Sequence, residues 1–257
     1  MEIVIIGLAA FFTAILTFFS GFGLGTILTP VFVIFFPVDV AIALTGVVHF
    51  SNNLFKIVLV GKSADRTVLL RFGIPAVISA IVGAWLLLQI TTLPSLYTYE
   101  LWGRILVITP LKLIISLLLI FFSILEISPS FKKIQFGKDK LFIGGILSGF
   151  FGGLTGIQGA IRSAFLIKSG LTKEAFIATG VVIASLVDFT RLTVYASRFA
   201  AASLHQNIAL LLTATLAAIA GAYIGKRLLK KVTLRSIQLI VAVLLVLISL
   251  AMGAGFI

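Results

Sequence analysis

Cysteine is absent from this sequence of 257 residues, so the chain forms neither a disulfide nor a metal site with thiolate ligands. Histidine is nearly absent as well, because His49 and His205 are too few for a histidine metal cluster. Acidic residues are scarce, with 8 Asp and Glu against 20 Lys and Arg. We therefore expect no metal and no cofactor in this strongly basic chain.

Charged residues of either sign are few, whereas apolar residues dominate. Hydrophobic residues make up 60% of the chain, charged residues make up 11%, and the mean hydropathy is +1.25. A water-soluble domain of this size would not stay in solution with that composition, so most of the surface must contact lipid. The basic residues stand in short links between apolar runs, which is typical of positive-inside membrane topology and not of a nucleic-acid-binding protein.

The apolar segments predict helices. A helix needs about 20 apolar residues to cross the core of a bilayer. Two apolar stretches, 3–36 and 141–168, are interrupted by glycines near their middle, and we expect each to form a hairpin of two short helices. The uninterrupted segments are predicted to be transmembrane helices, and they are 39–61, 71–90, 109–127, 172–195, 207–227 and 236–257.

The basic links predict the orientation. Of the 20 basic residues, 14 lie in links that we place in the cytoplasm, at 62–71, 132–140, 168–173 and 226–235. The segments 91–108 and 196–206 carry few basic residues and are expected to face outward. The hairpin 141–168 then opens toward the cytoplasm and the hairpin 3–36 toward the outside. Both termini are expected on the outer side of a multi-pass protein of the plasma or inner membrane.

An internal repeat divides the chain into two halves, 1–131 and 132–257, each a hairpin followed by three crossings. An odd number of crossings inverts the second half relative to the first. Inverted repeats with glycine-broken helices at matching positions are typical of secondary transporters whose substrate binds near the midplane. The matches recur in one order: Gly21-Phe22-Gly23-Leu24-Gly25 with Gly156-Ile157-Gln158-Gly159-Ala160, Thr45-Gly46-Val47-Val48 with Thr179-Gly180-Val181-Val182, and Gly83-Ala84-Trp85 with Gly221-Ala222-Tyr223.

Three glycine-rich runs resemble a known signature: Gly21-x-Gly23-x-Gly25-x-x-x-x-Pro30, Gly153-Leu154-x-Gly156-Ile157-x-Gly159 and Gly170-Leu171-x-Lys173-Glu174-Ala175-x-x-x-Thr179. They look like the duplicated motif of the sulfite exporter TauE/SafE family, and the resemblance covers nearly the whole chain. It implies a transporter of sulfite, thiosulfate, sulfoacetate or a related anion. The second half departs from the pattern at Gln158, Ala160, Arg162 and Phe165, which leaves the substrate open.

The glycine breaks are the first candidate substrate site. Glycine reaches backbone angles that other residues avoid and lets a ligand approach main-chain N–H groups. The helices after Gly25 and Gly159 would direct free N–H groups and a positive dipole end into the interior, which favours an anion. The alternative is that the glycines serve helix packing alone. The substrate-binding residues predicted here are Gly21, Gly23, Gly25, Thr26, Gly156, Gln158, Gly159 and Arg162.

Arg162 directly follows the second break. A guanidinium fork suits an oxyanion geometrically. A position near the cytoplasmic headgroups would explain Arg162 equally well.

Polar side chains form a stripe on the first full-length helix. Thr45, His49, Asn52 and Lys56 recur at spacings of four, three and four, with Asn53 beside them. Polar groups are costly against lipid, so this face should point into the protein. We expect Asn52, Asn53 and His49 to donate to substrate oxygens, with bonding between helices as the alternative. Lys56 is expected to snorkel toward the cytoplasmic surface.

Asp188 is the best candidate for an ionisable group deep in the membrane. It lies three residues from Ser185 and three from Arg191, so these side chains share a face of their helix. Asp188 and Arg191 form either a structural ion pair or a titrating site that couples transport to protons.

These patterns predict an all-α integral membrane protein that acts as a secondary transporter, and an exporter, of a small sulfur-containing anion. A passive anion channel or facilitator is the alternative. We do not expect an enzyme, because the sequence has no His-Glu-x-x-His and no Gly-x-Ser-x-Gly pattern. The expected partners are the anion and the lipid bilayer, with a homo-oligomer left open.

Overall fold

The structure, a computed structural model, describes residues 2–20, 24–130, 135–201, 207–228 and 234–257. Most of this part of the chain is helical, because a lipid environment requires backbone N–H and C=O groups to be bonded within their own segment. The main helices are α1 (Glu2–Ser20), α2 (Leu24–Val33), α3 (Val38–Val60), α4 (Arg66–Val68), α5 (Ile74–Thr91), α6 (Pro110–Ile127), α8 (Leu141–Thr155), α9 (Gly159–Leu166), α10 (Lys173–Ala201), α11 (Ile208–Leu228) and α12 (Leu234–Gly253).

Helix length and composition fit a membrane protein. Among the described residues, four helical segments are long and apolar enough to cross a bilayer. They are Val38–Ser63, Arg66–Thr91, Lys173–Ala196 and Ile208–Gly225. Shorter apolar helices accompany them, so the all-α membrane fold expected from the composition is confirmed.

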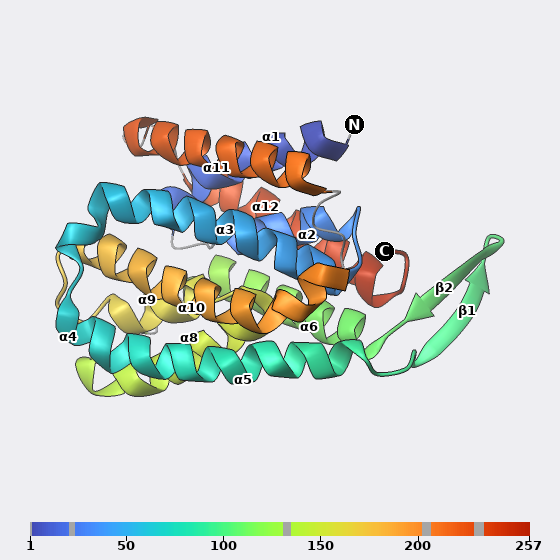
Figure 1. The fold of residues 1–257 in the computed structure, drawn as a ribbon, viewed down its shortest axis with the longest axis horizontal. Coiled ribbons are helices and arrows are strands. Elements are labelled where there is room, and N and C mark those ends of the chain that lie inside the picture. The colour runs from blue at the N-terminus through green and yellow to red at the C-terminus, as the bar shows by residue number, and fades with distance from the viewer. Residues whose placement is uncertain (1, 21–23, 131–134, 202–206, 229–233) are drawn as a thin grey trace.

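Each glycine-broken stretch contains two helices. α1, with 19 residues, and α2, with 10, occupy the first stretch, so α1 is longer than expected. α8, with 15 residues, and α9, with 8, occupy the second. Gly21 and Gly23, at the first break, lie outside the described residues. In Figure 1, α1 begins at the end of the molecule where the C-terminus lies, whereas α8 begins at the end marked by α4. This opposed placement is what the predicted inversion requires; the inversion and the division between residues 131 and 132 remain predictions.

The most extensive helix contacts join the two predicted halves. α1 packs along α11, α8 along α5, α3 along α10 and α6 along α12 (Figure 1). By the sequence matches, α1 of the first predicted half corresponds to α8 of the second, and α5 corresponds to α11. The contact between α1 and α11 is therefore the counterpart of the contact between α8 and α5. Much of the helix packing therefore joins segments that the sequence assigns to different predicted halves.

Glycines bring α8 into direct contact with the backbone of the segment 72–80. A Cβ on any of three α8 glycines, each one turn apart, would overlap a facing carbonyl, and these glycines are Gly145, Gly149 and Gly153. The carbonyls belong to Phe72, Ala76 and Ala80, which follow the same spacing. Small residues let membrane helices approach closely. At these three positions, close helix packing is therefore the reason that the residue is glycine.

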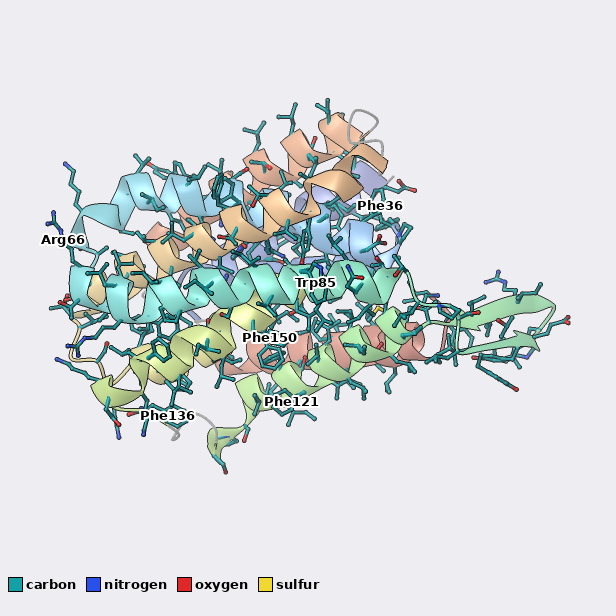
Figure 2. All side chains as sticks on the ribbon, turned by 60° about the horizontal axis from the view of Figure 1, so that its bottom comes forward. Phe36, Arg66, Trp85, Phe121, Phe136 and Phe150 are labelled. Carbon is teal, nitrogen blue, oxygen red and sulfur yellow. The ribbon has the colours of Figure 1, made fainter. Side chains whose placement is uncertain are left out.

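A β-hairpin, which the sequence analysis did not foresee, interrupts the link 91–108. β1 (Tyr97–Leu101) pairs antiparallel with β2 (Arg104–Ile108). Trp102 and Gly103 form the turn with φ of +53° and +70°, as a type I′ turn requires. The hairpin projects from the end of the bundle opposite α4 in Figure 1, and opposite Arg66 in Figure 2. At its base, Tyr99 Oη donates to the Ala254 carbonyl at 2.6 Å.

We predict that Gly149→Ala destabilises the protein. The new Cβ would overlap the Ala76 carbonyl and Ser79 Oγ, so α8 would have to move away from α5. Overpacking of this kind typically costs about 1–3 kcal/mol. Thermal unfolding of the purified protein in detergent should therefore show a lower midpoint.

Gly73→Ala is the matched control, because a Cβ there meets Ile183 Cγ1 at an ordinary distance of 3.7 Å. Its midpoint should stay close to that of the unsubstituted protein. Equal midpoints for the two variants would contradict a role for this close helix contact.

Candidate functional site

The polar stripe of α3 faces the interior of the bundle. Thr45, His49, Asn52, Asn53 and Lys56 are all buried. Their spacing of three and four residues gathers them on one face of the helix. That face meets α10, since His49 and Asn53 both hydrogen-bond to a side chain of that helix.

Asp188 of α10 is the common partner of His49 and Asn53 and is fully buried. Its Oδ2 accepts from His49 Nδ1 at 2.5 Å and from Asn53 Nδ2 at 3.2 Å. Its Oδ1 accepts from Arg191 Nε at 3.0 Å and lies 2.9 Å from Arg191 Nη2. A buried carboxylate is costly unless it is paired and hydrogen-bonded. Here both oxygens are bonded, and the bonds join α3 to α10.

The Arg191 guanidinium lies against two glycines. A Cβ on Gly46 would lie 3.3 Å from Nη2, and a Cβ on Gly156 would lie 2.6 Å from Nη1. Gly156 also has a φ of +80°, a left-handed conformation that disfavours other residues. Tyr195, one turn after Arg191, is buried and donates its hydroxyl to the Gly153 carbonyl just before the second break. The break and the arginine therefore depend on each other for their positions.

The start of α2 lies beside the second break. A Cβ on Gly25 would lie 3.1 Å from the Gly156 carbonyl oxygen and 3.8 Å from Thr45 Cγ2. Thr26 follows Gly25 and is fully buried. The helix that follows the first break and the turn that forms the second break are thus in contact, although they come from different halves of the sequence.

Gln158 and Arg162 extend the site along α9. Gln158 is buried at the end of the break, and the buried Gly159 begins the helix. Arg162 lies one turn later, with Nε 3.4 Å from where a Cβ on Gly180 of α10 would be. It is close enough to Asp188 to interact with it electrostatically. The second guanidinium therefore belongs to the same cluster as the first.

Positive charge exceeds negative charge in this cluster. Arg162 interacts electrostatically with Lys56 as well as with Asp188. Lys56 is only 7% exposed, so the expectation that it snorkels to the surface is wrong. Among the described side chains, Asp188 is the one acidic residue that is buried. Arg162 and Arg191 thus share a single carboxylate, and an excess of charge in the interior is unfavourable until an opposite charge compensates it.

Several buried polar atoms have no hydrogen-bond partner in the part of the chain that the structure describes. Buried polar groups are normally bonded, and an unbonded one costs about 1–3 kcal/mol. Apart from Ser123 of α6, these residues stand on the elements that meet at the breaks. They include the hydroxyls of Thr26, Thr29 and Thr45, both amide atoms of Asn52 and Gln158, and Nη1 of Arg162 and of Arg191. Most of these groups can donate, which is what an oxyanion requires.

Family comparison agrees with this geometry. The family model described as Sulfite exporter TauE/SafE matches residues 6–252, nearly the whole chain. The chain belongs to this family. It is a multi-pass membrane protein of a transporter family, and this membership points away from an enzyme. None of the curated proteins and none of the solved structures compared with it matches.

The structure of this TauE/SafE protein brings together predicted site residues from both halves. The exceptions are Gly21 and Gly23, which lie outside the described residues. Within the described side chains, no group of three or more His, Cys, Asp or Glu could hold a metal. The sequence analysis missed the contacts that Tyr195 and Gly46 make to this site. Tyr195 could have been found from its spacing of four residues from Arg191, and Gly46 from its place in the repeated Thr-Gly-Val-Val motif.

We predict that Asp188→Asn strongly destabilises this TauE/SafE protein. The substitution leaves Arg191 buried without its anionic partner, and breaking a buried pair costs about 3–5 kcal/mol. The midpoint of thermal unfolding in detergent should fall by several degrees or more.

The control is Asp139→Asn, which removes the carboxylate of an exposed ion pair with Lys140. Exposed pairs contribute little to stability. No measurable shift is expected for this variant. An Asp188→Asn protein as stable as the control variant would show that the buried carboxylate does not hold the cluster together.

Proposed function

We propose that this chain is a secondary transporter of a small oxyanion, which binds where the two helix breaks meet. The residues proposed to contact the anion are Asn52, Gln158, Arg162 and Arg191, with main-chain N–H groups at Gly25, Thr26 and Gly159. The observation that carries the proposal is that two guanidinium groups, those of Arg162 and Arg191, share Asp188, the one buried acidic residue among the described side chains.

Hydrogen bonding supports an anion in particular. An oxyanion offers oxygen atoms that accept hydrogen bonds, and guanidinium groups bind such atoms in a fork. Nη1 of Arg162 and Nη1 of Arg191 have no hydrogen-bond partner among the described residues. The first turn of a helix also leaves N–H groups without intrahelical partners, and both α2 and α9 begin at the breaks.

His49 and Asn53 have a different proposed role from the one expected from sequence. Both donate to Asp188 Oδ2, so their hydrogen-bonding capacity is directed to the carboxylate. We place them beside the anion site, where they hold Asp188. Asn52 differs from them, because both of its amide atoms lack a hydrogen-bond partner in the described part of the chain.

The family description supports the proposed class of substrate. The matching description names sulfite export. We propose sulfite, thiosulfate or an organosulfonate such as sulfoacetate as the anion, export as the direction, and the plasma or inner membrane as the location. The three oxygens that sulfur carries in each of these anions form a pyramid, which suits donors that converge from several helices.

We predict that Arg162→Gln raises the KM for anion transport about tenfold or more. The loss of a hydrogen bond to a charged group costs roughly 1.5–3 kcal/mol, and about 1.4 kcal/mol corresponds to a factor of ten. The measurement is saturable uptake of labelled thiosulfate and sulfite by liposomes that contain the purified protein.

Lys168→Gln is the matched control, because Lys168 is an exposed cation just beyond α9. Its KM should stay within a factor of two of that of the unsubstituted protein, since about 0.4 kcal/mol corresponds to such a factor. Equal KM values for the two variants would remove Arg162 from the proposed site. A flux that does not saturate, and that internal unlabelled anion does not accelerate, would favour a channel over a carrier.

A further inference from the structure

His49 contacts Asp188 and Asn53 within the positively charged cluster. Its Nδ1 donates to Asp188 Oδ2 at 2.5 Å. The Asn53 amide nitrogen lies 3.3 Å from Nδ1, 3.5 Å from the other ring nitrogen, Nε2, and 3.2 Å from Asp188 Oδ2. Histidine is the side chain whose charge change ordinarily falls near neutral pH. Because Nδ1 already carries the hydrogen that Asp188 accepts, Nε2 is the ring nitrogen at which a further proton can be added, where it would replace the lone pair that faces the Asn53 amide.

Asp188 of α10 is the charged group that contacts His49, and Arg191 of the same helix bonds to the other oxygen of Asp188. Arg162 of α9 interacts electrostatically with Asp188 and with Lys56 of α3, and the buried Tyr195 lies one turn after Arg191. α2 and α5, which also contact α3, carry no titratable side chain. On α11, the titratable residue whose side chain is described is Tyr223, and it is exposed. Lys62, just beyond the end of α3, is exposed as well.

The charge balance links this proton to the anion. A proton on His49 adds positive charge to a cluster in which Arg162 and Arg191 share one carboxylate, whereas a bound anion adds negative charge to the same cluster. Opposite charges in one cluster stabilise each other, so the proton and the anion are linked. Linkage is reciprocal, so a proton on His49 must favour the anion by the same factor.

We propose that His49 is the coupling site of the transport cycle, and that it binds one proton at Nε2 together with the anion, so that both cross the membrane in the same direction. This inference rests on the proposed function. The one bond that forms and breaks is Nε2–H: the proton comes from the solvent on the side where the anion binds, and it returns to the solvent on the side where the anion is released.

The test uses the full chain in liposomes that enclose a pH-sensitive dye, with the voltage clamped by potassium and valinomycin. Thiosulfate is the probe, because it stays deprotonated at neutral pH and cannot carry the proton itself, unlike sulfite. An inward thiosulfate gradient should acidify the interior in proportion to labelled thiosulfate uptake. Thiosulfate uptake without acidification overturns the inference and leaves the proposed function standing. No saturable uptake of thiosulfate or sulfite overturns both.

The variants assign the proton site. His49→Gln should lose at least tenfold of the acidification per thiosulfate, while exchange of labelled for unlabelled thiosulfate remains above that of protein-free liposomes. Ser185→Ala is the control, because this buried hydroxyl on α10 donates to the Val181 carbonyl of its own helix, and its coupling should be unchanged. Coupling that is retained in His49→Gln, or lost in Lys56→Gln and not in His49→Gln, overturns the assignment.

Asn53→Leu provides a second variant of similar size. It removes the amide beside Nε2, so the external pH at which thiosulfate uptake is half-maximal should shift. An unchanged pH midpoint in this variant overturns the proposal even if His49→Gln does not fold.

Discussion

A single buried carboxylate, Asp188, organises the centre of this protein. It accepts hydrogen bonds from α3 on one oxygen and from its own helix on the other. In a lipid environment such a charge is tolerated only when its partners are fixed in place. The partners are therefore fixed too: α3 and α10 are held together, and Arg191 is held against Gly46 and Gly156. The position of the Arg191 guanidinium beside the second break follows from this one group.

The glycines act at two levels around this centre. Away from the break, Gly145, Gly149 and Gly153 allow backbone contact between α8 and the segment 72–80, where packing replaces the hydrophobic effect that lipid cannot provide. At the break, Gly156 takes a left-handed conformation and leaves room for the Arg191 guanidinium. The packing and the substrate-site interpretations of glycine are thus both needed, and each applies to different positions of one helix. Because Gly153 also accepts from Tyr195, the two functions meet within one turn.

Much of the helical framework could be predicted because lipid leaves the backbone few alternatives. The apolar segments, their glycine interruptions and the polar stripe of α3 all follow from composition and from a spacing of three or four residues. Partners that are distant in sequence do not follow. His49 and Asp188 were both singled out, but nothing in the sequence joined them. Lys56 looked like a surface lysine because it lies near a helix end, and its burial contradicts that expectation. The β-hairpin escaped prediction because its turn is Trp102-Gly103, in place of the usual Asn-Gly signal.

The scarcity of acidic residues is tied to the same centre. Of the 8 Asp and Glu in the chain, Asp188 is the one that the structure buries among the described side chains. A second carboxylate in the cluster would balance the arginines internally and would compete with any external anion for their donors. In a cluster with no carboxylate, the two guanidinium groups would repel each other, and only a bound anion could offset that repulsion. A single carboxylate therefore keeps α3 and α10 joined in the absence of an anion and still leaves part of the positive charge uncompensated. This residual charge is the basis of the preference for an anion that we propose.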